Sequence, residues 1–372
     1  MASDRTLSQT TLSQTLPAEH THRKYASLQA GRAMAALLIV LHHASSYVSY
    51  EPRLWVHPAI GRWFAGTSLG VSFFFVLSGV VILTAHWNDI GRPARVRSYL
   101  IKRFRRIYPI YWIVLVPVLC SQLTRPDSQF LFHRDPYVIL SSILLVHIRS
   151  SETNLVVAWS LFHEIAFYAI FATVLLHKRI GTCLLVLWFV ASFFTFHQKG
   201  SVHDWSFFAS IHLLFAMGMF AAWVLRRKKV PSPDAMLILG TLIFFGVVLY
   251  SGYLGYISQG TYLASGIGAT LALLGASELE RHGRISVNKW LIFLGDASYS
   301  IYLIHYPVIS QLARICFRLD AHLHLPIGLW MLLLMSAGTA AGCLLHIVVE
   351  RPLLNWLRRS DRPSTQPAAQ TA

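Results

Sequence analysis

The sequence predicts an all-α integral membrane protein of about ten transmembrane helices. Of its 372 residues, 55% are hydrophobic and only 13% are charged, and the mean hydropathy is +0.50. A soluble domain of this length carries about 25% charged residues. The apolar residues also gather in runs near the 20 residues or so that a helix needs to cross a bilayer.

Ten apolar runs are predicted to span the membrane. They are residues 30–50, 64–86, 107–123, 154–177, 181–197, 205–225, 235–252, 261–277, 290–310 and 325–349. An eleventh run, 137–147, is short for a bilayer, so we expect it to be an interfacial or re-entrant segment.

The distribution of positive charge decides between these topologies. The net charge of +16 could indicate a nucleic-acid binder, but the 32 Lys and Arg residues lie mostly at the ends of apolar runs. With ten spans and a cytoplasmic N-terminus, 24 of the 32 fall on the inner side and 8 outside. With an eleventh span, 15 of the 32 would fall on the inner side and 17 outside. Because cytoplasmic loops carry the excess of Lys and Arg, this favours ten spans, both termini cytoplasmic and no nucleic-acid partner.

Two polar tails, 1–25 and 359–372, are predicted to be disordered and cytoplasmic, and to flank a membrane domain at 26–358. The first tail contains the direct repeat TLSQT-TLSQT and has none of the features of a signal peptide. The four cysteines are single and have no paired spacing, so neither a disulfide framework nor a metal site is expected.

The first span carries two ionisable residues, Arg32 and His43. Their eleven-residue separation corresponds to about 16 Å and close to three helical turns, so both lie on one face. An arginine within a membrane helix costs about 2.5 to 3.5 kcal/mol, which makes a functional site the default interpretation. The alternatives are a snorkelling arginine at the inner boundary and a hydrogen-bonded structural histidine, since the adjacent His42 is also polar.

Two other spans add polar groups at related depths. Glu164 lies ten residues past Asn154, about 15 Å into the fourth span, where an unpaired carboxylate is costly. Arg103 and Arg106 open the third span and, three residues apart, share a helix face. A topogenic role would also explain this basic pair. The sequence thus predicts a cationic inner mouth with a histidine and a carboxylate near the midplane.

Six short strings occur in an order that resembles one known family. They are Gln29-Ala30-Gly31-Arg32 with His43, the run 70–79, the run 103–111, Trp159-Ser160-Leu161 with Glu164 and Phe167-Tyr168, the run 294–305, and Glu350-Arg351-Pro352. Each string alone is weak, but all six in order are highly specific. Across residues 26–355 the chain resembles the bacterial integral-membrane acyltransferase 3 family, which O-acylates surface glycans, and most closely the short form typical of exopolysaccharide-production acetyltransferases.

The resemblance implies a ten-helix enzyme of the inner membrane that transfers an acyl group, acetyl by expectation, from acyl-CoA to a glycan or its lipid-linked precursor. It implies that Arg32 and His43 are the signature Arg and His pair, and that Arg103 and Arg106 form the second arginine motif. It also implies that the soluble esterase-like domain of some relatives is absent here. Two positions depart from the pattern: Ser72 stands where many relatives carry Asp, and Gly31 where Leu is usual.

The chemistry agrees with these assignments. Coenzyme A carries several phosphates and is made in the cytoplasm, and arginine forks suit phosphate. His43 can accept the proton of an attacking hydroxyl as a general base, although a covalent acyl-histidine is a second route. Glu164 could orient His43, stabilise its imidazolium or bind the acceptor.

Other polar side chains have weaker assignments. Trp159, Tyr302 and His305 are candidates for the acceptor site. Ser78 and Ser298 are candidate hydroxyl partners, but packing through small residues explains them more simply.

A different class of function uses the same residues. Midplane Arg, His and Glu could relay protons in a coupled transporter or a lipid-linked sugar flippase. The two halves of the chain show no obvious internal repeat, which counts against common transporter folds. A structural subunit of an export complex would leave the buried charges unexplained.

Overall fold

A computed structural model describes residues 25–50, 57–124, 134–148, 152–195, 207–227, 229–323 and 325–359. Within these ranges the chain is helical and contains no strand, which confirms the predicted all-α class. The predicted tails, apart from residues 25 and 359, lie outside the described residues.

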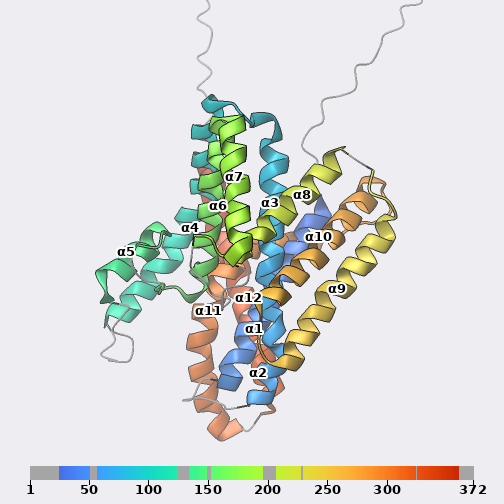
Figure 1. Cartoon of the computed structure of the whole chain (residues 1–372). Helices are drawn as coiled ribbons and strands as arrows, with labels where there is room; N and C mark the ends of the chain where they lie inside the picture. The colour runs from blue at the N-terminus through green and yellow to red at the C-terminus, as the bar shows by residue number, and fades with distance from the viewer. Residues whose placement is uncertain are drawn as a thin grey trace, which may run out of the picture.

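Each of the ten predicted spans falls on one long helix (Figure 1). These helices are α1 (Ala26–Tyr50), α3 (Gly70–His86), α4 (Val96–Thr124), α6 (Trp159–Leu176), α7 (Lys178–Phe194), α8 (Leu213–Arg227), α9 (Pro233–Leu254), α10 (Gln259–Arg281), α11 (Lys289–Leu323) and α12 (Ile327–Leu345). Shorter helices are α2 (Pro58–Phe64), α5 (Pro136–Leu144) and α13 (Arg351–Arg359).

Six helical segments of the described chain are long and apolar enough to cross a membrane. They contain α3, α4, α6, α9, α10 and α12. Of the other predicted spans, α7 and α8 have only 17 and 15 residues, and α1 and α11 carry polar residues of the candidate site. The protein is therefore a multi-pass membrane protein, and the count of ten spans stays a prediction.

The short apolar run forms α5, whose nine residues rise only about 14 Å. Its C-terminal carbonyls are held by α4: the Tyr108 hydroxyl donates to the Leu144 carbonyl at 2.8 Å, and the Trp112 indole donates to the Ile143 carbonyl at 2.9 Å. These bonds satisfy groups that a helix end leaves unpaired. α5 is thus too short to span a bilayer and is fastened to the side of α4.

Helix α1 packs against α3, α11 and α12, and these contacts set the site. Glycines allow the closest approaches: a Cβ built on Gly295 of α11 would lie 2.1 Å from the Gln29 carbonyl oxygen of α1. On the other side of α3, a Cβ on Gly218 of α8 would lie 1.9 Å from the Val76 carbonyl oxygen. Small residues commonly allow such close packing between membrane helices.

Basic segments far apart in the sequence meet at one end of the helix bundle. The Arg226 guanidinium of α8 donates to Asn88 at 3.2 Å, just past α3, and Gly91 lies against Lys178 at the start of α7. The Glu280 carboxylate accepts from the first two amides of α1, at 2.7 and 2.8 Å. In Figure 1 this is the upper end, and the chain enters α1 there.

Candidate active site

A cavity of about 840 Å³, including space open to solvent, lies between α1, α3, α4, α6 and α11. Four ionisable residues predicted for the site line it: Arg32, Arg103, Arg106 and Glu164. The other lining residues are Val71, Phe74, Phe75, Leu77, Ser78, Val81, Ile82, Ile107, Ser160, Leu161, Tyr168, Ser298, Tyr299 and Tyr302. Three helices contribute these four charges, so the site depends on the packing of the bundle.

Glu164 of α6 is held by two hydroxyl groups. The Ser78 hydroxyl of α3 donates to its Oε1 atom at 2.9 Å, and the Tyr168 hydroxyl, one turn further along α6, donates to the same oxygen. The Arg103 guanidinium lies 5.8 Å from the centre of the Tyr168 ring, within cation–π range. Glu164, Tyr168 and Arg103 therefore form one cluster on the cavity wall.

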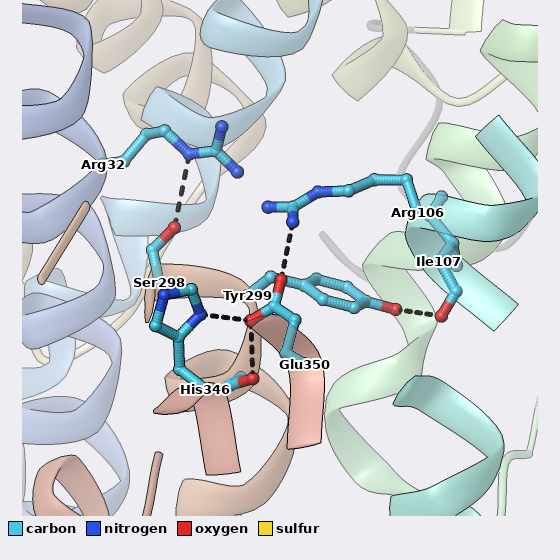
Figure 2. Close-up of polar contacts among 8 residues, drawn as sticks. Arg32, Arg106, Ile107, Ser298, Tyr299, His346 and Glu350 are labelled. Atoms are coloured by element: carbon cyan, nitrogen blue, oxygen red, sulfur yellow. Dashed lines mark hydrogen bonds and ion pairs between the residues drawn. The ribbon is translucent and has the colours of Figure 1, made fainter. Parts of the chain in front are cut away.

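Arg32 and Arg106 enter the cavity from opposite sides, and Figure 2 shows their guanidinium groups pointing toward each other. The Nε atom of Arg32 donates to the Ser298 hydroxyl at 3.2 Å. Arg106 donates through Nη1 to Oε1 of Glu350 at 2.5 Å. The site thus brings together all three arginines that the sequence predicted.

His43 lies beyond this cavity, two ring contacts from its wall. Its ring centre is 5.2 Å from that of His305 and 5.0 Å from that of Tyr306, both on α11. His305 is fully buried, and its ring is 6.0 Å from that of Tyr302, which does line the cavity. The structure therefore groups His43 with His305 and Tyr302, and places neither His42 nor His43 on the cavity wall.

Tyr302 lies between the cavity and His305 and packs on Phe74, which also lines the cavity. The ring centres of Tyr302 and Phe74 are 6.0 Å apart, and the Tyr302 hydroxyl donates to the Val157 carbonyl at 2.7 Å and lies 2.6 Å from the Ser160 hydroxyl. Trp159, another predicted acceptor-site residue, packs on Phe75 with ring centres 6.4 Å apart. Tyr302 alone of the three predicted acceptor residues lines the cavity.

The sequence identifies only some of the partners in the site. Ser78 and Ser298 are candidate hydroxyl partners by sequence, with packing as the simpler explanation, and in the structure each is bonded to a charged site residue. The sequence assigns no role to Glu350 and predicts that His346, near the end of a span, is interfacial. A carboxylate at the end of an apolar span is the signal that could have marked Glu350, because such a charge needs a partner.

The two departures from the family pattern have local explanations. A Cβ at Gly31 would lie 2.5 Å from the Phe73 ring, so Phe73 occupies the space of a larger side chain. Ser72 is buried, and its hydroxyl lies 2.7 Å from the Ser265 hydroxyl of α10 and 2.6 Å from the Leu69 carbonyl oxygen. A neutral hydroxyl pair thus joins α3 to α10.

Comparison with known proteins gives consistent matches. The model of the acyltransferase 3 family, described as an acyltransferase domain, matches residues 25–348. The chain is 27% identical to the exopolysaccharide production protein ExoZ of Rhizobium meliloti, over 79% of this chain and 92% of ExoZ. It is 24% identical to the peptidoglycan O-acetyltransferase OatA of Listeria monocytogenes. It is also 24% identical to YrhL of Bacillus subtilis, named as a putative peptidoglycan O-acetyltransferase. These two matches cover 77% of this chain and 50% and 49% of the relatives. No solved structure matches.

The family match covers most of the chain and includes the three helices that carry the cavity charges. The helical membrane fold and the gathered Arg and Glu side chains agree with it. The chain therefore belongs to the acyltransferase 3 family and is a multi-pass membrane O-acyltransferase.

Proposed function

We propose that the protein transfers an acetyl group from cytoplasmic acetyl-CoA to a hydroxyl of a cell-surface glycan or of its lipid-linked precursor. The names of ExoZ and OatA, which concern exopolysaccharide and peptidoglycan, support a glycan acceptor. The protein would act in the bacterial inner membrane with both termini in the cytoplasm, as the distribution of Lys and Arg favours.

The gathering of Arg32, Arg103 and Arg106 around one cavity carries the proposal. Glu164 is the only acidic residue among the cavity's lining residues, so the wall carries more positive than negative charge. Arginine forks bind phosphate oxygens through paired, charge-assisted hydrogen bonds. The cavity therefore suits a donor whose phosphates stay near the arginines while its thioester arm extends toward Tyr302.

His43 is proposed as the general base of the transfer. The acceptor oxygen attacks the thioester carbonyl carbon and its proton passes to His43, while the carbon–sulfur bond breaks and the CoA thiolate leaves and takes up a proton. A positioned histidine typically accelerates such a step by about 10² to 10⁴. Because Tyr302 lies between the cavity and His305, which contacts His43, the Tyr302 ring would have to shift for the thioester to reach His43.

Glu164 is proposed to act within the donor cavity. Among the described residues its hydrogen bonds come from Ser78 and Tyr168, and none joins it to His43. This contact pattern supports a role toward bound donor or acceptor more than orientation of His43. Tyr302, His305 and Trp159 are proposed to bind the acceptor. Tyr302 and His305 lie between the cavity and His43.

Donor recognition can be tested by changing Arg32 or Arg103 to Ala. Loss of one charged hydrogen bond costs about 1.5 to 3 kcal/mol, so we expect the Kd of purified protein for acetyl-CoA to rise about 10- to 150-fold. Lys should restore binding only in part, because it lacks the planar fork. The measurement is calorimetric titration in detergent micelles, alongside consumption of acetyl-CoA by the wild-type protein.

A short thioester, S-acetyl-N-acetylcysteamine, serves as the control donor because it lacks the nucleotide phosphates. Its turnover should be nearly unchanged by either substitution. Equal losses of turnover with acetyl-CoA and with the short thioester would mean that the arginines support folding or membrane insertion. No acetyl-CoA consumption by folded wild-type protein would favour the transporter or flippase interpretation.

A further inference from the structure

Glu350 is a fully buried carboxylate next to the cavity, and three side chains bind it. Its Oε1 atom accepts from Arg106 at 2.5 Å, and its Oε2 atom lies 2.7 Å from Nδ1 of His346 (Figure 2). The Oε2 atom also accepts from the Ser300 hydroxyl at 2.7 Å. Its side chain has an exposed fraction of 0%. A buried charge is tolerated only when it is paired and hydrogen-bonded in this way.

The backbone around Glu350 departs from a regular α-helix. Residues His346–Glu350 form a π-helical turn between α12 and α13, closed by the bond from the Arg351 amide to the His346 carbonyl. Pro352 follows directly and has no amide hydrogen to continue the ladder. Single π turns occur frequently at functional sites. Here the turn places His346 and Glu350 on the side that faces Arg106 and Ser300.

Arg106 is held from a second side by Tyr299. The Arg106 guanidinium lies 5.4 Å from the centre of the Tyr299 ring, and the Tyr299 hydroxyl donates to the Ile107 carbonyl at 2.7 Å. This bond joins α11 to α4 beside Arg106. The side chain keeps 30% of its surface exposed and lines the cavity, so part of it stays open to the cavity while Glu350 and Tyr299 hold the guanidinium.

The three cavity arginines are therefore held differently. Arg32 donates to the neutral Ser298 hydroxyl, and Arg103 stacks on Tyr168 while its buried Nε atom has no hydrogen-bond partner among the described residues. Arg106 is bonded directly to a carboxylate. An arginine whose fork is already oriented loses less conformational freedom when it binds an anion.

We propose that Glu350 is a positioning residue that orients Arg106 toward the anionic part of the acyl donor. The inference rests on the proposed function, because it takes the donor to be acyl-CoA. Glu350 does not line the cavity and acts through Arg106. Ser300 and His346 hold the carboxylate in turn, so the π turn of α12 contributes to donor binding.

The test is the Kd for CoA of wild type, Glu350→Gln, Arg106→Ala and the double variant, by calorimetric titration of protein purified in detergent. We expect each single substitution to weaken binding by about tenfold, as for one charge-assisted bond. We expect the double variant to bind no more weakly than Arg106→Ala. Additive losses would overturn the proposal, since Glu350 would then act independently of Arg106.

The chain offers a matched control in Glu278 and Arg281 of α10. This pair also has a 2.5 Å contact, and its side chains are 1% and 33% exposed, but neither residue lines the cavity. Glu278→Gln should lower the melting temperature about as much as Glu350→Gln and leave the Kd for CoA unchanged. An equal rise in Kd for both variants would show a general effect of lost stability.

A less disruptive variant tests the proposal if Glu350→Gln does not fold. Ser300→Ala removes one bond to the carboxylate and keeps its charge. In the protein that keeps Arg106, Ser300→Ala should raise the Kd for CoA by about threefold. In the Arg106→Ala variant it should leave the Kd unchanged. An unchanged Kd in both proteins would overturn the inference. Wild-type protein that fails to bind CoA would instead overturn the proposed function.

Discussion

At the residue scale, His42 and His43 are neighbours that face different surroundings. The ring of His43 contacts His305 and Tyr306 of α11. The His42 carbonyl accepts bonds from the Ser45 and Ser46 hydroxyls at 2.8 Å within α1. Successive residues on a helix point about 100° apart, so the two imidazoles leave α1 in different directions.

This difference predicts unequal effects of two substitutions. His43→Ala should lower acyl transfer by about 10² to 10⁴, the usual contribution of a general base, while the Kd for acetyl-CoA stays near that of wild type. His42→Ala should keep most activity. The measurement is the rate of transfer to a defined acceptor, with Kd measured in parallel. His43→Ala with a rate within a few-fold of wild type would contradict the mechanism.

At the element scale, the packing of α1 against α11 fixes the positions of Arg32 and His43 relative to their partners on α11. α1 carries Arg32 and His43, and α11 carries Ser298, Tyr302 and His305. Arg32 meets Ser298 and His43 meets His305 across this contact, where the helix backbones come close at Gly295. A shift of α11 would therefore disturb the Arg32 contact and the His43 contact together.

Gly295→Ala tests this dependence. Its Cβ would lie 2.1 Å from the Gln29 carbonyl oxygen, and a backbone atom cannot turn away. We expect a stability loss of about 1 to 3 kcal/mol, typical of overpacking, with reduced acyl transfer, measured by thermal melting in detergent and by activity. Gly246→Ala on α9 is the control, because nothing lies within 4 Å of its new Cβ. Equal melting temperatures for the two variants would refute the close contact.

At the scale of the whole molecule, the basic segments form one charged end. Contacts join the end of α3 to α8, the 88–92 turn to α7, and the end of α10 to the start of α1. At the opposite end the Arg62 guanidinium of α2 donates to the Tyr253 carbonyl of α9 at 2.7 Å. The positive-inside rule predicts that the first of these ends faces the cytoplasm.

Reporter fusions test this orientation. A reporter after Arg179 or Lys229 should behave as cytoplasmic, and one inserted in the 252–260 loop as external, because 24 of the 32 basic residues then lie inside. The measurement is the activity of paired reporters that work on only one side of the membrane. An external signal at Lys229 would restore the eleven-span topology.

The sequence alone determined the helices and which polar residues lie in them. Apolar runs located all ten long helices. The rise of 1.5 Å per residue predicted the arginines at the inner mouth and Glu164 near the midplane with His43, whereas the structure places Glu164 on the cavity wall with the arginines and His43 beyond it. Which residues a helix contains is a local property of the sequence, so it can be predicted along the chain.

Only the tertiary structure decided which side chains became partners. The bonds of Arg106 to Glu350 and of Glu164 to Ser78 join residues 244 and 86 positions apart. Tyr302 lies between the cavity and His305, which contacts His43, although His43 and Arg32 share a helix. These relations depend on how each helix is rotated and which helix lies beside it, and the packing of the whole bundle, with its glycine contacts, sets both.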